Sequence, residues 1–159
     1  MMQRKNVLLC GVLLLLAVML AFAGCSKKDD EGAESAACKS LDELSEKVGY
    51  SVNTPMYLPG KGYEQSYRAL EDNVAQIVYQ SDEQTITFTM AKQADMDLLG
   101  DLSDYPEEFE STCKGFVVPL AGKDGVAYAA QWSENDKTFA LRFEVGITPE
   151  LFDEVIKGV

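Results

Sequence analysis

An alternation of apolar and polar side chains constrains the fold of this chain more than any other feature. Successive side chains of a β-strand point to opposite faces, so this period of two predicts strands with one buried face. A preceding strand over about residues 65–70 completes a run of antiparallel strands. The apolar residues of the alternating segments are Ala75, Ile77 and Tyr79; Ile86, Phe88 and Met90; Val126, Tyr128, Ala130 and Trp132; and Phe139, Leu141, Phe143 and Val145.

Two short helices are predicted at the ends of this run of strands. Ser40 and Glu43 have the spacing of a capping box, apolar residues then follow at helical spacing, and Gly49 is a natural stop. At the other end, Thr148 suits the N-cap position and Pro149 the first helical position. Each helix has one apolar face, which predicts that each packs on the sheet.

Together these elements predict one α+β domain, an antiparallel meander sheet with an N-terminal and a C-terminal helix. Asp124-Gly125 is a strong signal for a hairpin between two of its strands. Residues 94–110 show no alternation and are rich in acids, so a loop with at most one helical turn is expected there. A sheet that is polar on one side is expected to have a helix-covered face and a wetter face.

The N-terminus has the three parts of a secretory signal. Arg4 and Lys5 precede an apolar run from Val7 to Phe22, which is short for a spanning helix, and small residues follow. The order Phe22-Ala23-Gly24-Cys25 resembles the bacterial lipobox, although Leu is usual where Phe22 stands. Lipidation at Cys25 is therefore predicted; a simple cleaved signal and an uncleaved membrane anchor are the alternatives.

The resulting organisation is a lipoprotein signal peptide over 1–24, a lipidated Cys25 with a flexible tether over 25–38, and an extracytoplasmic domain over 39–159. Removing Arg4 and Lys5 leaves 12 basic against 26 acidic residues, a net charge of −14. Such a charge disfavours nucleic acid and anionic lipid headgroups as partners. The expected location is the extracytoplasmic face of the cell membrane, held there by the lipid.

Two cysteines, Cys38 and Cys113, remain in the predicted domain. An even pair outside the cytoplasm is consistent with a disulfide, and two unpaired, partly buried thiols are equally consistent with the spacing.

Several short motifs recur together in a known group of proteins. They are Tyr57-Leu58-Pro59-Gly60 with Gly62-Tyr63, Thr87 to Lys92, Ala130-Gln131-Trp132, and Thr148-Pro149-Glu150-Leu151. In this layout the chain resembles an uncharacterised extracytoplasmic domain of Gram-positive bacterial lipoproteins and of some anti-sigma-like membrane regulators. The resemblance covers the chain from about Leu41 onward and implies fold and location, not an activity. The segment from Ala94 to Asp101 is longer than the family pattern.

Catalysis is not expected. The chain has no histidine, which removes the commonest general base and the usual partner of a nucleophilic Ser or Cys. No phosphate-binding Gly-rich loop or nucleophile elbow is present. A hydrolase with two carboxylates remains open from composition alone, but it would need a cleft between its acids.

The acidic loop is the one candidate metal site. Asp95, Asp97 and Asp101 could supply hard oxygen ligands to calcium, which extracellular modules often bind weakly. The segment does not fit an EF-hand, because Leu99 occupies a ligand position and Pro106 stands where the bidentate Glu belongs. The alternative is an ordinary solvated acidic loop.

The expected function is therefore a non-catalytic binding or interaction module for an envelope protein, with a solute- or calcium-binding lipoprotein as the alternative. The strand aromatics are expected to form the core, although a ligand groove is the other interpretation. Thr85, Thr87 and Thr89 share the polar face of their strand and could meet a protein partner.

Overall fold

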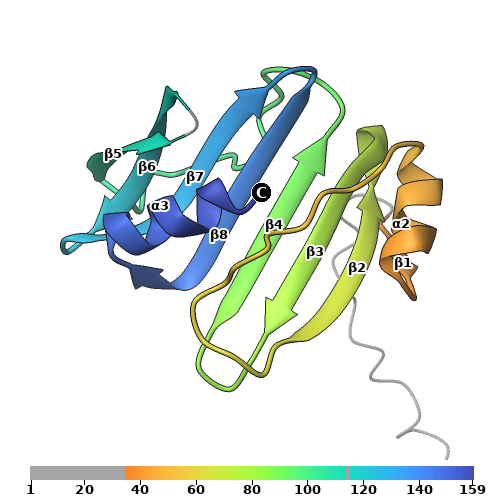
Figure 1. Ribbon diagram of the computed structural model, residues 1–159, viewed down its shortest axis with the longest axis horizontal. Helices are drawn as coiled ribbons and strands as arrows, with labels where there is room; N and C mark the ends of the chain where they lie inside the picture. Colours follow the sequence, from red (N-terminus) through yellow and green to blue (C-terminus); the bar gives the residue numbers. More distant parts are fainter. Residues whose placement is uncertain (1–34, 114) are drawn as a thin grey trace, which may run out of the picture. The chain divides into compact units, whose positions relative to one another are not determined.

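The structure is a computed structural model that describes residues 35–113 and 115–159. Within them, all eight strands form a single antiparallel sheet in the order β1-β2-β3-β4-β8-β7-β6-β5 (Figure 1). The predicted signal segment, Cys25 and most of the predicted tether lie outside the described residues. The elements are β1 (Ala36–Cys38), α2 (Leu41–Val48), β2 (Glu64–Leu70), the 3-10 turn η1 (Glu71–Asn73), β3 (Val74–Gln80), β4 (Thr85–Ala91), β5 (Glu107–Cys113), β6 (Phe116–Lys123), β7 (Val126–Glu134), β8 (Lys137–Ile147) and α3 (Pro149–Lys157).

The predicted fold class, an α+β domain with a meander sheet, is wrong. Strands hold 48% of the described residues and helices only 16%, so the fold is sheet-rich. The sheet is also not one meander: β1 to β4 and β5 to β8 each follow chain order, but β4 pairs with β8. Short-range alternation predicts strands but cannot predict which strands become neighbours, because that pairing is decided by contacts distant in sequence.

One face of the sheet carries the hydrophobic core. Helix α2, the segment at residues 49–63 and helix α3 all contribute to one continuous core cluster, and in Figure 1 they lie over the same side of the strands. Phe88, Leu141 and Phe143 are fully buried there. Five of the six strand aromatics considered in the sequence are buried in this core, whereas Tyr128 is half-buried. These five therefore belong to the core, as the first interpretation of the sequence predicted.

Local sequence signals explain the ends of both helices. The Ser40 hydroxyl accepts a hydrogen bond from the Glu43 amide (3.2 Å), and Gly49 ends α2 in the left-handed conformation with φ +79°. The Thr148 hydroxyl likewise accepts from the Leu151 amide (3.3 Å), with Pro149 at the start of α3. The helices have eight and nine residues, and no helix in the described ranges is long and apolar enough to cross a membrane.

Two edge strands differ from the sequence-based expectation. Residues 107–110 were expected to belong to a loop, but β5 (Glu107–Cys113) pairs along its whole length with β6. Residues 36–38 were assigned to the tether, but β1 pairs with β2. Edge strands need few large apolar residues, and β5 has only Phe109 as a large apolar side chain, so the alternation that reveals inner strands is absent.

Candidate functional site

Within residues 35–113 and 115–159, no helix covers the sheet face opposite the core over β2, β3 and β4. Cross-strand pairing places Arg68 beside Gln76 and Gln76 beside Thr89, whereas Thr87 pairs with Arg142 of β8. Arg68 is exposed, and Gln76, Thr87 and Arg142 are half-buried. We call this surface the outer face; it is polar and mixed in charge, as the alternation predicted.

Residues 92–106, which join β4 to β5, lie against the outer face over β7 and β8. Gln131 holds this connection from both sides of its amide: the Leu98 amide donates to Oε1 (2.8 Å), and Nε2 donates to the Met96 carbonyl (2.9 Å). The buried Thr138 hydroxyl donates to the Gln93 carbonyl (2.7 Å). Because backbone groups of the connection are tied to strand side chains, it forms a fixed wall beside the open strands.

A groove of about 250 Å³ lies between this wall and the open strands. Arg142 supplies its one charged side chain, and its Nη2 donates to the Leu99 carbonyl (2.8 Å). Polar side chains of the strands form one side of the groove, and Leu98 and Leu99 of the connection form the other. We call it the outer groove, and its lining consists of Gln76, Thr87, Thr89, Leu98, Leu99, Ala140 and Arg142.

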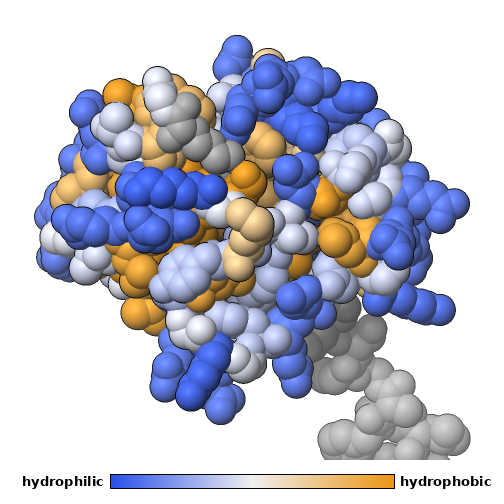
Figure 2. Space-filling model, in the orientation of Figure 1, coloured by the Kyte–Doolittle hydropathy of each residue, from blue (hydrophilic) through white to orange (hydrophobic). Residues whose placement is uncertain are grey.

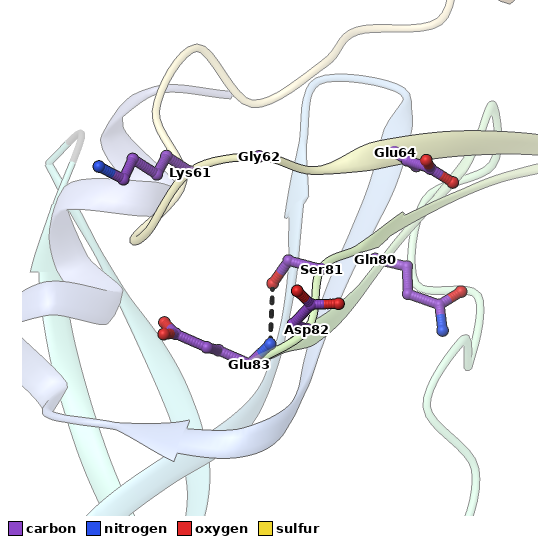
Figure 3. Close-up of a pocket in the computed structure, with 7 residues that line it drawn as sticks. All are labelled: Lys61, Gly62, Glu64, Gln80, Ser81, Asp82 and Glu83. Carbon is purple, nitrogen blue, oxygen red and sulfur yellow. Dashed lines mark hydrogen bonds between the residues drawn. The ribbon is translucent and has the colours of Figure 1, made fainter.

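A larger hollow, about 700 Å³, lies where the turn between β3 and β4 meets the start of β2 (Figure 3). Its charged side chains do not converge: Figure 3 shows Lys61 and Glu64 pointing in opposite directions along their segment. The turn itself is held by Ser81, whose hydroxyl accepts from the Glu83 amide (3.3 Å). This geometry does not provide the facing carboxylate pair that two-acid hydrolysis requires.

In the structure, Asp97 and Asp101 of the predicted metal site cap turns, and Asp95 bonds to Ser133 of β7. Asp97 Oδ1 accepts from the amides of Leu99 (3.2 Å) and Gly100 (2.9 Å), while Asp95 Oδ1 accepts from the Ser133 hydroxyl (3.2 Å). The Ser103 amide donates to Asp101 (2.9 Å), and this hydrogen bond lowers the pKa of the Asp101 carboxyl. Among the described residues, no three His, Cys, Asp or Glu side chains are grouped to hold a metal ion. Calcium binding therefore gains no geometric support here.

Cys38 and Cys113 are both free and are not brought together. Cys38 lies in β1 and Cys113 in β5, which are the two opposite edges of the sheet. The Cys113 thiol is buried at the core side, whereas Cys38 is half-buried. The candidate disulfide is thus not formed in this structure.

One polar cluster, between β5 and α3, was not predicted from the sequence. Ser111 of β5 is 3% exposed, and its hydroxyl donates to Asp153 of α3, whose other carboxylate oxygen lies 2.7 Å from Lys157 Nζ. Burial opposes ionisation of Asp153, but the hydrogen bonds from Lys157 and Ser111 lower the pKa of this carboxyl below its ordinary value. A three-residue combination drawn from two distant elements has no signature in sequence; here it fastens α3 to β5.

The described residues carry few large apolar side chains that are well exposed. On the side shown in Figure 2, hydrophobic side chains form several separate areas divided by hydrophilic ones. The large apolar side chains that are well exposed among the described residues are Met56, Tyr57, Val117 and Val145. Met56 and Tyr57 are adjacent, but the other two lie on separate strands, so no extended hydrophobic surface results.

No family model, no curated protein and no solved structure matches this chain. The resemblance to an extracytoplasmic lipoprotein domain remains a prediction.

Proposed function

We propose that this chain is a lipid-anchored extracytoplasmic interaction module, non-catalytic, which binds an envelope protein through its outer face. The observation that carries the proposal is the asymmetry of the sheet. One face is covered by α2, residues 49–63 and α3 over a continuous core. On the opposite face, the described residues leave the polar side chains of β2 to β4 exposed or half-buried for the most part. A closed core with an open sheet face suits binding of another macromolecule better than enclosure of a small solute.

The anchoring part of the proposal rests on the sequence. The secretory signal, the small residues before Cys25 and the polar segment after it support lipidation and a place at the extracytoplasmic face. The resemblance to lipoprotein domains is consistent with the same location. A calcium- or solute-binding role has no comparable support, because the loop aspartates accept hydrogen bonds from the protein itself and the larger hollow is open and polar.

Membrane anchoring is tested by fractionating cells that express the Cys25→Ala variant of the full chain. Loss of the lipid is expected to move the protein from the membrane fraction to the soluble extracytoplasmic fraction, with Cys10→Ala as the matched cysteine control that stays in the membrane. Retention of Cys25→Ala in the membrane would contradict lipid anchoring.

Binding through the outer face is tested by placing a photo-crosslinking amino acid at single exposed or half-exposed positions. Ser66 and Val78 share the outer face, since they are cross-strand partners, whereas Glu46 on α2 and Lys123 in the β6–β7 hairpin lie elsewhere. Irradiation of cells is expected to give the same discrete adduct from Ser66 and Val78 and none from Glu46 or Lys123. Equal labelling from all four positions would overturn the assignment of this face.

A further inference from the structure

The outer groove is free of acidic groups in a chain dominated by them. None of its seven lining residues is a carboxylate, although the full chain carries 26 Asp and Glu residues against 14 Lys and Arg. Its only formal charge is the Arg142 guanidinium. A cation held in a recess without acids attracts an anion at short range, even when the net charge of the protein is negative.

Arg142 is positioned for this role by the connection at residues 92–106. One of its five N–H groups is engaged by the Leu99 carbonyl at 2.8 Å, which fixes the side chain in the groove. Arg142 forms no ion pair with any residue in the described ranges. Its planar guanidinium therefore keeps donors for a carboxylate, which it can bind in a bidentate manner.

The neighbouring side chains extend the same chemistry along the sheet. Thr87 is the cross-strand partner of Arg142, and Gln76 pairs with both Thr89 and Arg68. Hydroxyl and amide groups beside Arg142 can donate to the same anion, and exposed Arg68 adds a second cation at the β2 side. Opposite them, Leu98 and Leu99 form an apolar wall.

We propose that the outer groove binds an extended segment of a partner protein in which an acidic side chain lies next to apolar ones. The Asp or Glu carboxylate pairs with Arg142, and its apolar neighbours pack against Leu98 and Leu99. This inference rests on the proposed function and names the partner chemistry of the same face.

The test uses the full chain in detergent and two fluorescein-labelled pentapeptides, Leu-Glu-Leu-Glu-Leu and Leu-Gln-Leu-Gln-Leu, with blocked ends. Fluorescence anisotropy is expected to give about tenfold tighter binding of the Glu peptide, the order of effect of a hydrogen bond to a charged group. Arg142→Gln is expected to abolish the preference, and Arg68→Gln to reduce it. Lys123→Gln, which removes a cation in a distant hairpin, is expected to leave it unchanged.

Two further variants distinguish loss of the pair between Arg142 and the peptide carboxylate from a general loss of structure. Glu144→Gln removes the acid nearest to Arg142 along β8 and is expected to maintain or tighten binding of the Glu peptide. Arg142→Lys keeps the charge but not the planar donor pair, so an intermediate preference is expected. Equal affinity for both peptides, no binding of either, or an undiminished preference in Arg142→Gln would overturn the inference. If the peptide preference is not found but Ser66 and Val78 still crosslink to a partner in Arg142→Gln, the proposed function is supported and only the proposed role of Arg142 is wrong.

Discussion

Tyr50 and Tyr79 both pack into the core, but only the Tyr50 hydroxyl has a hydrogen-bond partner within the described part of the chain. The Tyr50 hydroxyl donates to the Met90 carbonyl (2.7 Å) and lies 3.0 Å from the Asn73 carbonyl. The Tyr79 hydroxyl is buried without a hydrogen-bond partner among the described residues, and its ring lies edge-on to that of Tyr63. A satisfied hydroxyl stabilises the fold, whereas a buried unsatisfied one costs free energy.

The two tyrosines therefore predict opposite effects of the same substitution. Tyr50→Phe is expected to lower the free energy of unfolding by about 1 kcal/mol, because the Met90 carbonyl loses its donor. Tyr79→Phe is expected to leave it unchanged or raise it. Urea unfolding of each variant measures the difference, and a larger loss in Tyr79→Phe than in Tyr50→Phe would contradict this account.

The same residues predict how stability depends on alkaline pH. Burial is the main cause that raises the pKa of both hydroxyls from 10.0 to about 12. Because ionisation is easier in the unfolded chain, their contribution to stability is complete below about pH 10 and is lost as the pH rises toward 12. Urea unfolding at pH 8, 10 and 11 should show this decline. It should be smaller in the Tyr50→Phe/Tyr79→Phe double variant; an equal decline there would show that other groups cause it.

Among contacts between elements, the hydrogen bonds of Gln131 hold residues 92–106, the connection between β4 and β5, against the sheet. The Gln131 side-chain amide contacts the backbone of Met96 and Leu98, which are distant in sequence. Gln131→Met keeps the length of the side chain but removes both hydrogen bonds. Amide hydrogen exchange in peptides covering residues 94–100 is expected to accelerate about thirtyfold, from the loss of two bonds of ~1 kcal/mol each.

The matched control is Gln80→Met, since Gln80 lies in β3 and is exposed. No change in exchange at residues 94–100 is expected from it. Equal exchange in Gln131→Met and the unaltered chain would mean that other contacts, such as Thr138 with Gln93, suffice to hold the connection.

Elements with local signals were predictable, and those without them were not. Both helices begin at the capping residues predicted from sequence, because an N-cap is decided within four residues. The inner strands were recognisable because burial on one face imposes alternation. The edge strands β1 and β5, and the docking of residues 92–106, depend on partners elsewhere in the chain and left no such pattern.

At the scale of the whole molecule, strand order separates the two cysteines of the domain. Cys38 and Cys113 lie on opposite edge strands, seven strand spacings of ~4.8 Å apart, so on the order of 30 Å across the sheet. A disulfide requires Cα atoms within ~7 Å. Both thiols are therefore expected to be reduced within one molecule.

Alkylation of the full chain with iodoacetamide, after denaturation and without reductant, tests this expectation. Peptides carrying Cys38 and Cys113 should each gain one adduct, and Cys38 should react faster in the native protein because Cys113 is buried. A peptide pair linked through both cysteines, recovered from monomeric protein, would contradict the strand order itself.

The amino-acid sequence was sufficient to predict the helix caps and the inner strands, because these depend on neighbouring residues; its composition showed the acidic character, and the anchor at Cys25 stays a prediction. The sequence also indicated a polar sheet face through Thr85, Thr87 and Thr89. The pairing of β4 with β8 was visible only in the fold, and it places Arg142 beside Thr87. The fold likewise brings Leu98 and Leu99 to the same outer groove. The physical reason is that capping and alternation act over a few residues, whereas strand pairing and groove formation depend on packing between segments far apart in the chain.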